Sequence, residues 1–230
     1  MADPDSQTIR AYHVFNAEAA GQFKGMARPG FFVLDTRGII REKFFEAKYR
    51  ERLSGNNVIA KLFPELGAEV ASTTEAPHLR LTLEQSDRTA FPGGLVTLTA
   101  ELQLPPDVHV YAPGTLDYKP IKLTIDPAPE TELRPAIYPP AKTLYLPAIK
   151  ERVPVFAGTF RIRQDVKVSS AADFSNALGT EGKSLPITGK IEYQACDSKI
   201  CFLPESLPVQ WHLQVLPLDR QRAPEDIRHK

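Results

Sequence analysis

The chain has 230 residues, of which 42% are hydrophobic and 24% are charged, as in ordinary globular proteins of one large or two small domains. Its 28 basic and 28 acidic residues cancel, so charge gives no reason to expect nucleic acid or an anionic membrane as a partner. No apolar run approaches the about 18 residues needed to cross a bilayer, so we expect no membrane span in this chain. Residues 1–6 have neither the basic nor the apolar region of a signal peptide, so a protein acting outside the cytosol would be seen here in mature form or as part of a longer chain.

The first part of the chain, residues 1–67, has the pattern of a mixed α/β segment. The apolar run 29–35 predicts a buried strand, and the run 39–45 predicts a second strand that pairs with it as a hairpin. Ser54 or Asn56 is expected to cap a short helix, because the apolar residues that follow recur at spacings of three and four.

Residues 68–77 are small and polar, and we interpret them as a linker. From residue 78 onward, apolar and polar residues alternate in short segments that are separated by proline-rich turns. About seven to nine such strands predict an immunoglobulin-like β-sandwich over residues 78–217, with Trp211 in its core. A polar tail follows at residues 218–230. The predicted fold class is therefore mainly β, with an N-terminal α/β segment.

The two cysteines of the chain, Cys196 and Cys201, have four residues between them and follow the alternating segment 187–193. A disulfide that closes so short a loop stabilises the fold by roughly 2 kcal/mol, a brace that a domain with its own core does not need. A thiol–disulfide couple explains the pair better, because exchange requires one thiolate to attack and a second thiol nearby to resolve the mixed disulfide. A structural hairpin disulfide, or two inert buried thiols, is the alternative.

A few other side chains are candidates for the surroundings of the cysteines. His109 and Tyr111 share one face of a predicted strand and either pack over the cysteines, where one of them tunes a thiolate, or form an edge-strand pair without a chemical role. Tyr193 fits core or cap packing better than catalysis, and Glu205 either influences a proton near Cys201 or is a solvated turn carboxylate. The remaining histidines are scattered, and no pair has the spacing of metal ligands, so we expect no metal site.

Three segments of the second half carry a family resemblance. They are Tyr193–Cys196 with Cys201 and Pro204–Glu205, then Val108–Gly114, and finally Val155–Phe160. With these segments, residues 78–216 resemble the N-terminal periplasmic domain of DsbD-type thiol:disulfide interchange proteins, the disulfide-corrector family. The resemblance implies an immunoglobulin-like sandwich that works in the periplasm or otherwise outside the cytoplasm and exchanges disulfides with thioredoxin-fold partners without a cofactor.

The same resemblance implies roles for individual residues. Cys201 is expected to form the mixed disulfide with a partner, and Cys196 to resolve it. A loop with an aromatic residue covers the cysteines in this family, and residues 143–150 are the equivalent here. Tyr145 is the first candidate for this cap, with Leu144 or Leu146 as alternatives.

The first half resembles the C-terminal part of a redoxin of the peroxiredoxin or thioredoxin-like kind, over residues 9–66. This resemblance rests on Gly25–Pro29, Phe31–Asp35 and Gly38. Pro29 stands where thioredoxin folds place a cis-proline. The β-α-β unit that holds the nucleophilic cysteine of those families is absent, which argues against a redoxin-family peroxidase. We expect an incomplete thioredoxin-like segment that self-associates through an unpaired strand edge.

Together, these patterns predict a thiol:disulfide exchange module that shuttles electrons between thioredoxin-fold partners through Cys196 and Cys201. The alternative is a non-catalytic β-sandwich interaction domain whose one disulfide is structural.

Overall fold

The computed structural model describes residues 3, 5–21, 24–45, 53–66, 69–115, 118–146 and 150–218. Its N-terminal segment contains helix α1 (Gln7–Ala11), strands β1 (Gly30–Leu34) and β2 (Ile40–Phe45), helix α2 (Gly55–Leu62) and the 3-10 turn η2 (Pro64–Leu66). Strands β1 and β2 pair antiparallel, which confirms the predicted hairpin. The peptide bond before Pro29 is trans, so the cis-proline implied by the redoxin resemblance is not present.

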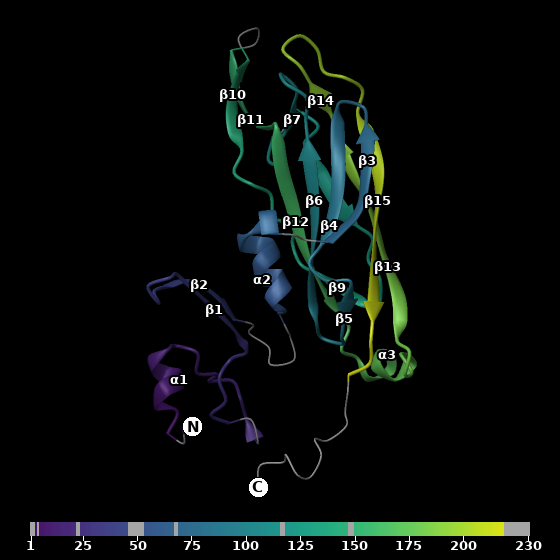
Figure 1. Cartoon of the computed structure of the whole chain (residues 1–230). Helices are drawn as coiled ribbons and strands as arrows, with labels where there is room; N and C mark the ends of the chain where they lie inside the picture. Colours follow the sequence, from purple (N-terminus) through teal and green to yellow (C-terminus); the bar gives the residue numbers. More distant parts are fainter. Residues whose placement is uncertain are drawn as a thin grey trace.

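Two sheets form the body of the molecule. In spatial order, the five-stranded sheet contains β3 (Glu69–Ala76), β4 (Leu79–Gln85), β6 (Leu95–Gln103), β12 (Thr159–Val168) and β9 (Thr131–Leu133). The sheet that faces it contains β5 (Thr89–Ala90), β15 (Glu205–Val215), β13 (Lys183–Tyr193) and β8 (Lys122–Ile125). Helix α3 (Ala172–Ala177) connects β12 to β13 at one end of these sheets (Figure 1).

The core lies between these two sheets, because alternate residues of their strands point inward. Leu81, Ile162 and Ile191 are examples from three strands, each at most 2% exposed. Trp211 is fully buried among them, and its indole Nε1 donates a hydrogen bond to the carbonyl oxygen of Glu84 at 2.9 Å. The structure thus confirms the immunoglobulin-like β-sandwich and the position of Trp211 in its core.

Residues 69–76, which the sequence suggests as part of a linker, form the edge strand β3 instead. This strand pairs antiparallel with β4 along its length, from Glu69 opposite Gln85 to Ala76 opposite Leu79. Seven of its eight residues are exposed, so no alternation of apolar and polar residues marks it in the sequence. Backbone pairing with β4 therefore creates the strand, and its polar, charged side chains suit an edge that faces water.

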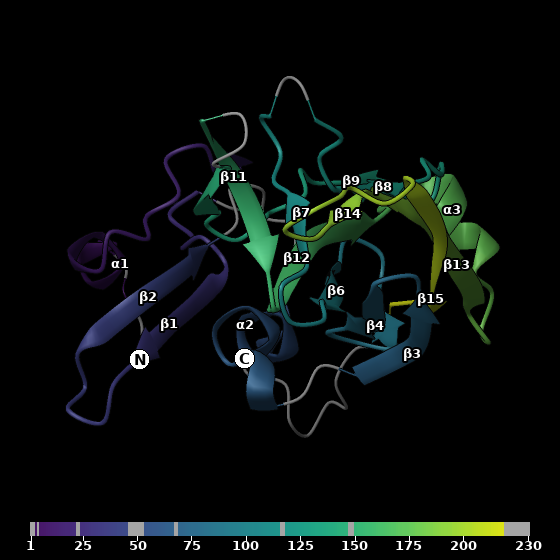
Figure 2. The same ribbon diagram turned by 90° about the horizontal axis from the view of Figure 1, so that it is seen from above.

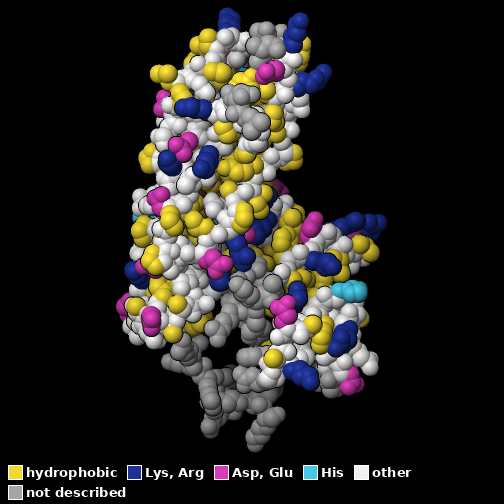
Figure 3. All heavy atoms as spheres, turned by 180° about the vertical axis from the view of Figure 1, so that it is seen from behind, with side chains coloured by type: hydrophobic (Ala, Val, Ile, Leu, Met, Phe, Trp, Pro, Cys, Tyr) yellow, Lys and Arg dark blue, Asp and Glu magenta, His cyan; other side chains and the backbone are white. Residues whose placement is uncertain are grey.

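Helix α2 lies beside the sandwich (Figures 1 and 2), and polar side chains hold it there. Ser54 is its N-cap, as one of the two alternatives predicts, and Asn57 completes a capping box with it. Asn57 is fully buried, and its Nδ2 donates to Ser86 Oγ at 2.7 Å. At the other end of the helix, Lys61 Nζ lies 2.6 Å from Asp165 Oδ2 on β12. The helix is therefore packed against the sandwich, whereas α1 and the hairpin form a lobe beside it (Figure 3).

A third, smaller sheet stands at the end of the sandwich opposite α3 (Figure 1). In spatial order it contains β10 (Lys142–Leu146), β11 (Glu151–Ala157), β7 (His109–Tyr111) and β14 (Ala195–Cys196). The strands are antiparallel neighbours, and the short strand β14 brings the first cysteine to the edge of the sheet.

Candidate redox site

The two cysteines form a disulfide at this edge. Their sulfur atoms are 2.04 Å apart and their Cα atoms 4.0 Å apart. The turn between them is closed by Asp197, whose Oδ1 accepts hydrogen bonds from the backbone N–H groups of Lys199 at 2.7 Å and Ile200 at 2.8 Å. Hydrogen bonds from these backbone groups lower the pKa of the Asp197 carboxyl, so it is ionised near neutral pH.

The residues after the turn are anchored to the sandwich. The backbone N–H of Phe202 donates to the carbonyl oxygen of Ala195 at 2.8 Å, and the Gln194 side chain donates to the carbonyl oxygen of Phe202 at 2.9 Å. The Phe202 ring stacks on His78, with 3.6 Å between ring centroids. Both ends of the cysteine turn are thus held, one by β14 and the other by Phe202.

The two cysteines differ sharply in exposure. Cys196 is 1% exposed and belongs to a buried apolar cluster, whereas Cys201 lies at the surface. A sulfur nucleophile from another protein can therefore approach Cys201 without rearrangement of the strands, while Cys196 is covered.

Strand β7 presents one polar side chain to each cysteine. In the pairing of β7 with β14, His109 stands directly opposite Cys196, and Val110 opposite Ala195. Val110 belongs to the sandwich core, so His109 and Tyr111 point to the other face, as the alternation of a strand requires. The Tyr111 hydroxyl oxygen is 3.7 Å from Cys201 Sγ, within hydrogen-bond distance for sulfur.

The His109 and Tyr111 rings also contact each other edge to face, with 5.6 Å between centroids. Burial raises the pKa of the Tyr111 hydroxyl, and the Glu151 carboxylate raises it further. Tyr111 therefore keeps its proton at neutral pH and is able to donate it in a hydrogen bond to a sulfur.

The β10–β11 hairpin covers the buried cysteine. The buried cluster that includes this cysteine comprises Tyr111, Val153, Val155 and Cys196, with Tyr118, Leu144 and Leu146 packed against them. Tyr145, the first candidate for the cap, lies on the opposite face of β10: it is 49% exposed, with the Arg152 guanidinium 5.6 Å from its ring centroid. Leu144 and Leu146, the alternatives, pack against the cluster that contains Cys196, because side chains two apart on a strand share a face. Residues 147–149 of the expected cap lie outside the described residues.

Tyr118 is a member of this cluster that the sequence does not single out. Its ring stacks on Tyr111 with 4.2 Å between centroids, and its hydroxyl donates to Glu151 Oε2 at 2.7 Å. A bridge between Tyr111 and Pro120 brings this segment back alongside β7. No periodicity marks it, although an aromatic residue so soon after the His-x-Tyr segment is a signal that could have been followed.

Tyr193 and Glu205 lie elsewhere. Tyr193 belongs to the sandwich core, and its hydroxyl donates to the carbonyl oxygen of Pro77 at 2.7 Å. Burial, with a further effect of the Glu205 carboxylate, raises the pKa of Tyr193 to about 12. Glu205 stands opposite Tyr193 at the start of β15. The pair thus belongs to the core side of the strands and not to the cluster around Cys196.

A groove of about 790 Å³ opens beside the disulfide, between β10 and the segment that leads into β7. His109, Asp197 and Ser198 form its side nearest the cysteines. His109 is only 7% exposed, and its Nε2 has no hydrogen-bond partner. Burial lowers the pKa of His109, while the Asp197 carboxylate acts in the opposite direction. The imidazole is therefore neutral at pH 7.

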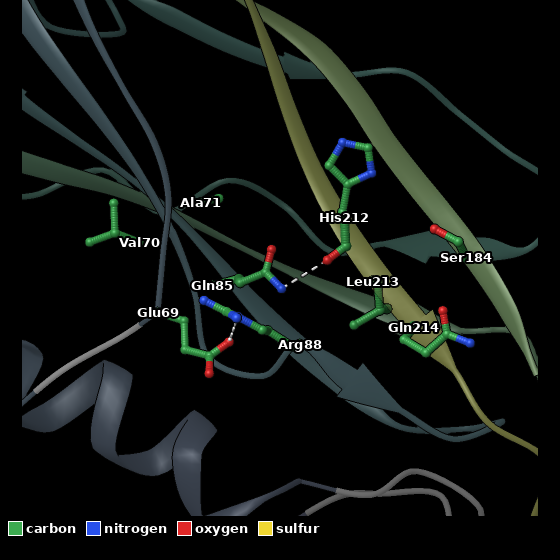
Figure 4. A pocket seen from close by; sticks show the side chains of 9 residues that line it. All are labelled: Glu69, Val70, Ala71, Gln85, Arg88, Ser184, His212, Leu213 and Gln214. Atoms are coloured by element: carbon green, nitrogen blue, oxygen red, sulfur yellow. Dashed lines mark hydrogen bonds and ion pairs between the residues drawn. The ribbon is translucent and has the colours of Figure 1, made fainter.

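A second hollow, of about 370 Å³, lies between β3, β4 and β15 (Figure 4). Three of its polar side chains already have partners within the hollow: Arg88 Nε is 2.6 Å from Glu69 Oε2, and Gln85 donates to the backbone carbonyl oxygen of His212 at 3.0 Å. This internal pairing leaves it a weaker candidate than the disulfide edge. Within the described residues, no group of three or more His, Cys, Asp or Glu side chains is placed to hold a metal ion, and no helix is long and apolar enough to cross a membrane.

The fold and the edge disulfide define a β-sandwich domain with a thiol–disulfide site. The family model of the N-terminal part of thiol:disulfide interchange protein DsbD matches residues 81–210, more than half of the chain. The chain belongs to this family, which is named for thiol:disulfide interchange. The match leaves residues 1–67 outside, so their resemblance to a redoxin stays a prediction.

Solved structures give weaker similarity. The N-terminal periplasmic domain of ScsB from Proteus mirabilis matches with a TM-score of 0.43 and 11% identity, over 67% of this chain and 55% of that one. The reduced N-terminal domain of DsbD from Neisseria meningitidis matches with a TM-score of 0.32 and 13% identity, over 68% of this chain and 98% of that one. The chain thus spans about half the length of the ScsB domain. No curated protein sequence matches it.

Proposed function

We propose that this chain is a thiol:disulfide exchange module that passes electrons between thioredoxin-fold partners through Cys196 and Cys201. The observation that carries the proposal is the unequal burial of the two cysteines: Cys196 is 1% exposed, whereas Cys201 is an exposed residue. Exchange through a mixed disulfide needs this division, because one sulfur must meet the partner and the other must stay beside it to resolve the bond.

Electron uptake begins when a partner thiolate attacks Cys201 Sγ. The Cys196–Cys201 bond breaks, a partner–Cys201 disulfide forms, and Cys196 leaves as a thiolate that takes up a proton. The second thiolate of the partner then attacks its own sulfur in the mixed disulfide and releases Cys201, whose thiolate is also protonated. The partner ends as a disulfide, and this chain gains two electrons and two protons in its dithiol. No cofactor is needed.

Electron delivery runs in the opposite direction. The Cys201 thiolate attacks the disulfide of an oxidised partner, and the Cys196 thiolate resolves the mixed disulfide by attack on Cys201 Sγ. The Tyr111 hydroxyl, 3.7 Å from this sulfur, is suited to stabilise the Cys201 thiolate by hydrogen bonding. The family membership supports a location outside the cytoplasm, where such disulfides persist.

Trapping with matched cysteine variants tests the proposal. The probe is a thioredoxin whose resolving cysteine is replaced by serine and whose remaining thiol carries thionitrobenzoate. Cys196→Ala should accumulate a disulfide-linked complex with it, seen on a non-reducing gel and by mass spectrometry, with release of thionitrobenzoate. Cys201→Ala, which retains only the buried thiol, should react at least about tenfold more slowly, because an inaccessible thiol attacks poorly. Equal trapping by the two variants, or none by either, contradicts the proposal.

The alternative is an interaction domain whose disulfide is structural. A redox titration against glutathione and dithiothreitol separates the two, since structural disulfides have potentials below about −300 mV. A value in that range would favour the structural role. Self-association through residues 1–67, in which β1 and β2 stand as a two-stranded sheet, stays a separate prediction for analytical ultracentrifugation.

A further inference from the structure

The exchange steps leave one buried polar group beside the disulfide without a role. His109 is 7% exposed, and its Nε2 is buried without a hydrogen-bond partner. Buried polar atoms are almost always paired, so an unpaired one next to a reactive centre calls for an explanation. Its position supplies one, because His109 stands directly opposite Cys196 in the β7–β14 pairing. Directly opposite residues on antiparallel strands have Cβ atoms about 4.5–5.5 Å apart on the same face.

Cys196 has a proton-transfer problem that Cys201 lacks. The resolving step requires a Cys196 thiolate, and a charged thiolate is disfavoured among the apolar side chains of Val153 and Val155. Cys201 lies at the surface, where water and the Tyr111 hydroxyl are available to it. Cys196 at 1% exposure has little access to water. A base within the protein is therefore the direct route by which the Cys196 thiol loses its proton.

His109 has the properties of such a base. Burial keeps the imidazole neutral at pH 7, so a ring nitrogen is free to accept a proton. The Asp197 carboxylate, which faces it from the cysteine turn, stabilises the imidazolium that forms. The other ionisable groups that line the groove are Asp107, which precedes β7, and Lys142 and Tyr145 on β10. Tyr111 packs edge to face against the His109 ring. The groove also connects His109 to solvent, so the proton has an exit to water.

We propose that His109 accepts the proton of the Cys196 thiol as Cys196 resolves a mixed disulfide on Cys201, and returns a proton to Cys196 when the disulfide is reduced. The inference rests on the proposed exchange function. In the resolving step, the S–H bond of Cys196 breaks, its proton moves to the imidazole, and its electron pair forms the new bond to Cys201 Sγ. The partner sulfur leaves with the electron pair of the mixed disulfide, and the imidazolium passes its proton to water in the groove.

Stopped-flow reaction of the reduced chain with Ellman's reagent separates the two thiols. Cys201 attacks first and releases one thionitrobenzoate, and Cys196 then attacks Cys201 Sγ and releases the second. His109→Gln should slow the second release by about 100-fold, the lower end of the usual effect of a general base, and leave the first within about twofold. His212→Gln, the same substitution at an exposed histidine on β15 away from the disulfide, is the matched control and should change neither release. A second release of unchanged rate in His109→Gln overturns the proposal.

A measurement on the unaltered protein makes the test independent of how well the variant folds. The rate of the second release should rise through an inflection below pH 6.5, the ordinary value of histidine, as His109 loses its proton. NMR titration of the His109 ring in the reduced chain should give the same midpoint. Midpoints that differ by more than one pH unit overturn the proposal. Absence of both releases, or a first release that keeps its full rate in Cys201→Ala, would instead contradict the exchange function itself.

Discussion

Asn57 joins helix α2 to the sandwich from a fully buried position, so its replacement by alanine should destabilise the sandwich as a whole. Its Nδ2 donates to Ser86 Oγ at 2.7 Å, and its Oδ1 accepts from the backbone N–H of Ser54 at 2.8 Å. The alanine variant removes both bonds. It also leaves the N–H of the helix cap without its acceptor.

The size of the effect follows from these contacts. The two hydrogen bonds contribute about 0.5–1.5 kcal/mol each, and the half-buried Ser54 N–H left without an acceptor adds part of its desolvation cost, so the free energy of unfolding should fall by about 2–3 kcal/mol. In a domain of this size, 1 kcal/mol shifts the melting temperature by about 2–4 °C, so Asn57→Ala should melt about 4–12 °C lower. Trp211, the single tryptophan, lies in the core and reports unfolding of the sandwich by its fluorescence. The control is Asn56→Ala: this exposed neighbour makes one hydrogen bond to Asp87, and its loss should cost less than about 0.5 kcal/mol.

The result that would refute this reasoning is a Trp211 transition that moves equally little in both variants. It would mean that α2 detaches from the sandwich without cost and that the residues before β3 form a separate unit. A shift in Asn57→Ala alone would instead place the start of the cooperative unit at or before Ser54. That boundary lies well before residue 81, where the family match begins.

Two further predictions concern the redox site. Burial lowers the pKa of His109 below its unfolded value of about 6.5, so the unfolded chain binds more protons as the pH falls through this value. The oxidised chain should therefore lose stability in urea titrations as the pH drops below about 6.5, and His109→Gln should flatten this loss; the same slope in both proteins would contradict it. Asp197→Ala removes the acceptor that closes the cysteine turn, whereas Asp197→Asn keeps one. The alanine variant should therefore be reduced at a less negative potential in glutathione titrations, because its thiols are less well held together, and equal potentials would argue against the turn's role.

Much of the fold can be predicted from the period of two in the second half. A strand that buries one face has apolar residues at every second position, as β4 has with Leu79, Leu81 and Leu83. The edge strand β3 cannot be predicted in this way, because its side chains are exposed on both faces. The docking of α2 cannot be predicted from the period either. It depends on a hydrogen bond of the buried Asn57 and an ion pair of Lys61, and both partners lie more than 25 positions away in the sequence.

In the site, too, features set by neighbouring residues can be predicted from the sequence, whereas features set by distant segments cannot. The spacing of the cysteines predicts the pair, and the alternation of His109 and Tyr111 predicts their common face. Which residue of the cap hairpin covers Cys196 depends on parity along β10, and a shift of one position exchanges Tyr145 for Leu144. Tyr118 depends on a chain reversal that only the folded structure reveals.

The anchoring of the cysteine turn helps to distinguish a disulfide that takes part in exchange from a structural disulfide. A structural disulfide holds together segments that would otherwise separate, whereas here the backbone already holds them. Cys196 is fixed by its pairing with His109, and Phe202 after the turn is bonded to Ala195 and stacked on His78. Reduction therefore leaves the two thiols close to each other, and their high effective concentration favours rapid resolution of a mixed disulfide. A disulfide that the fold does not need, with one sulfur exposed, is the arrangement that repeated opening and closing requires.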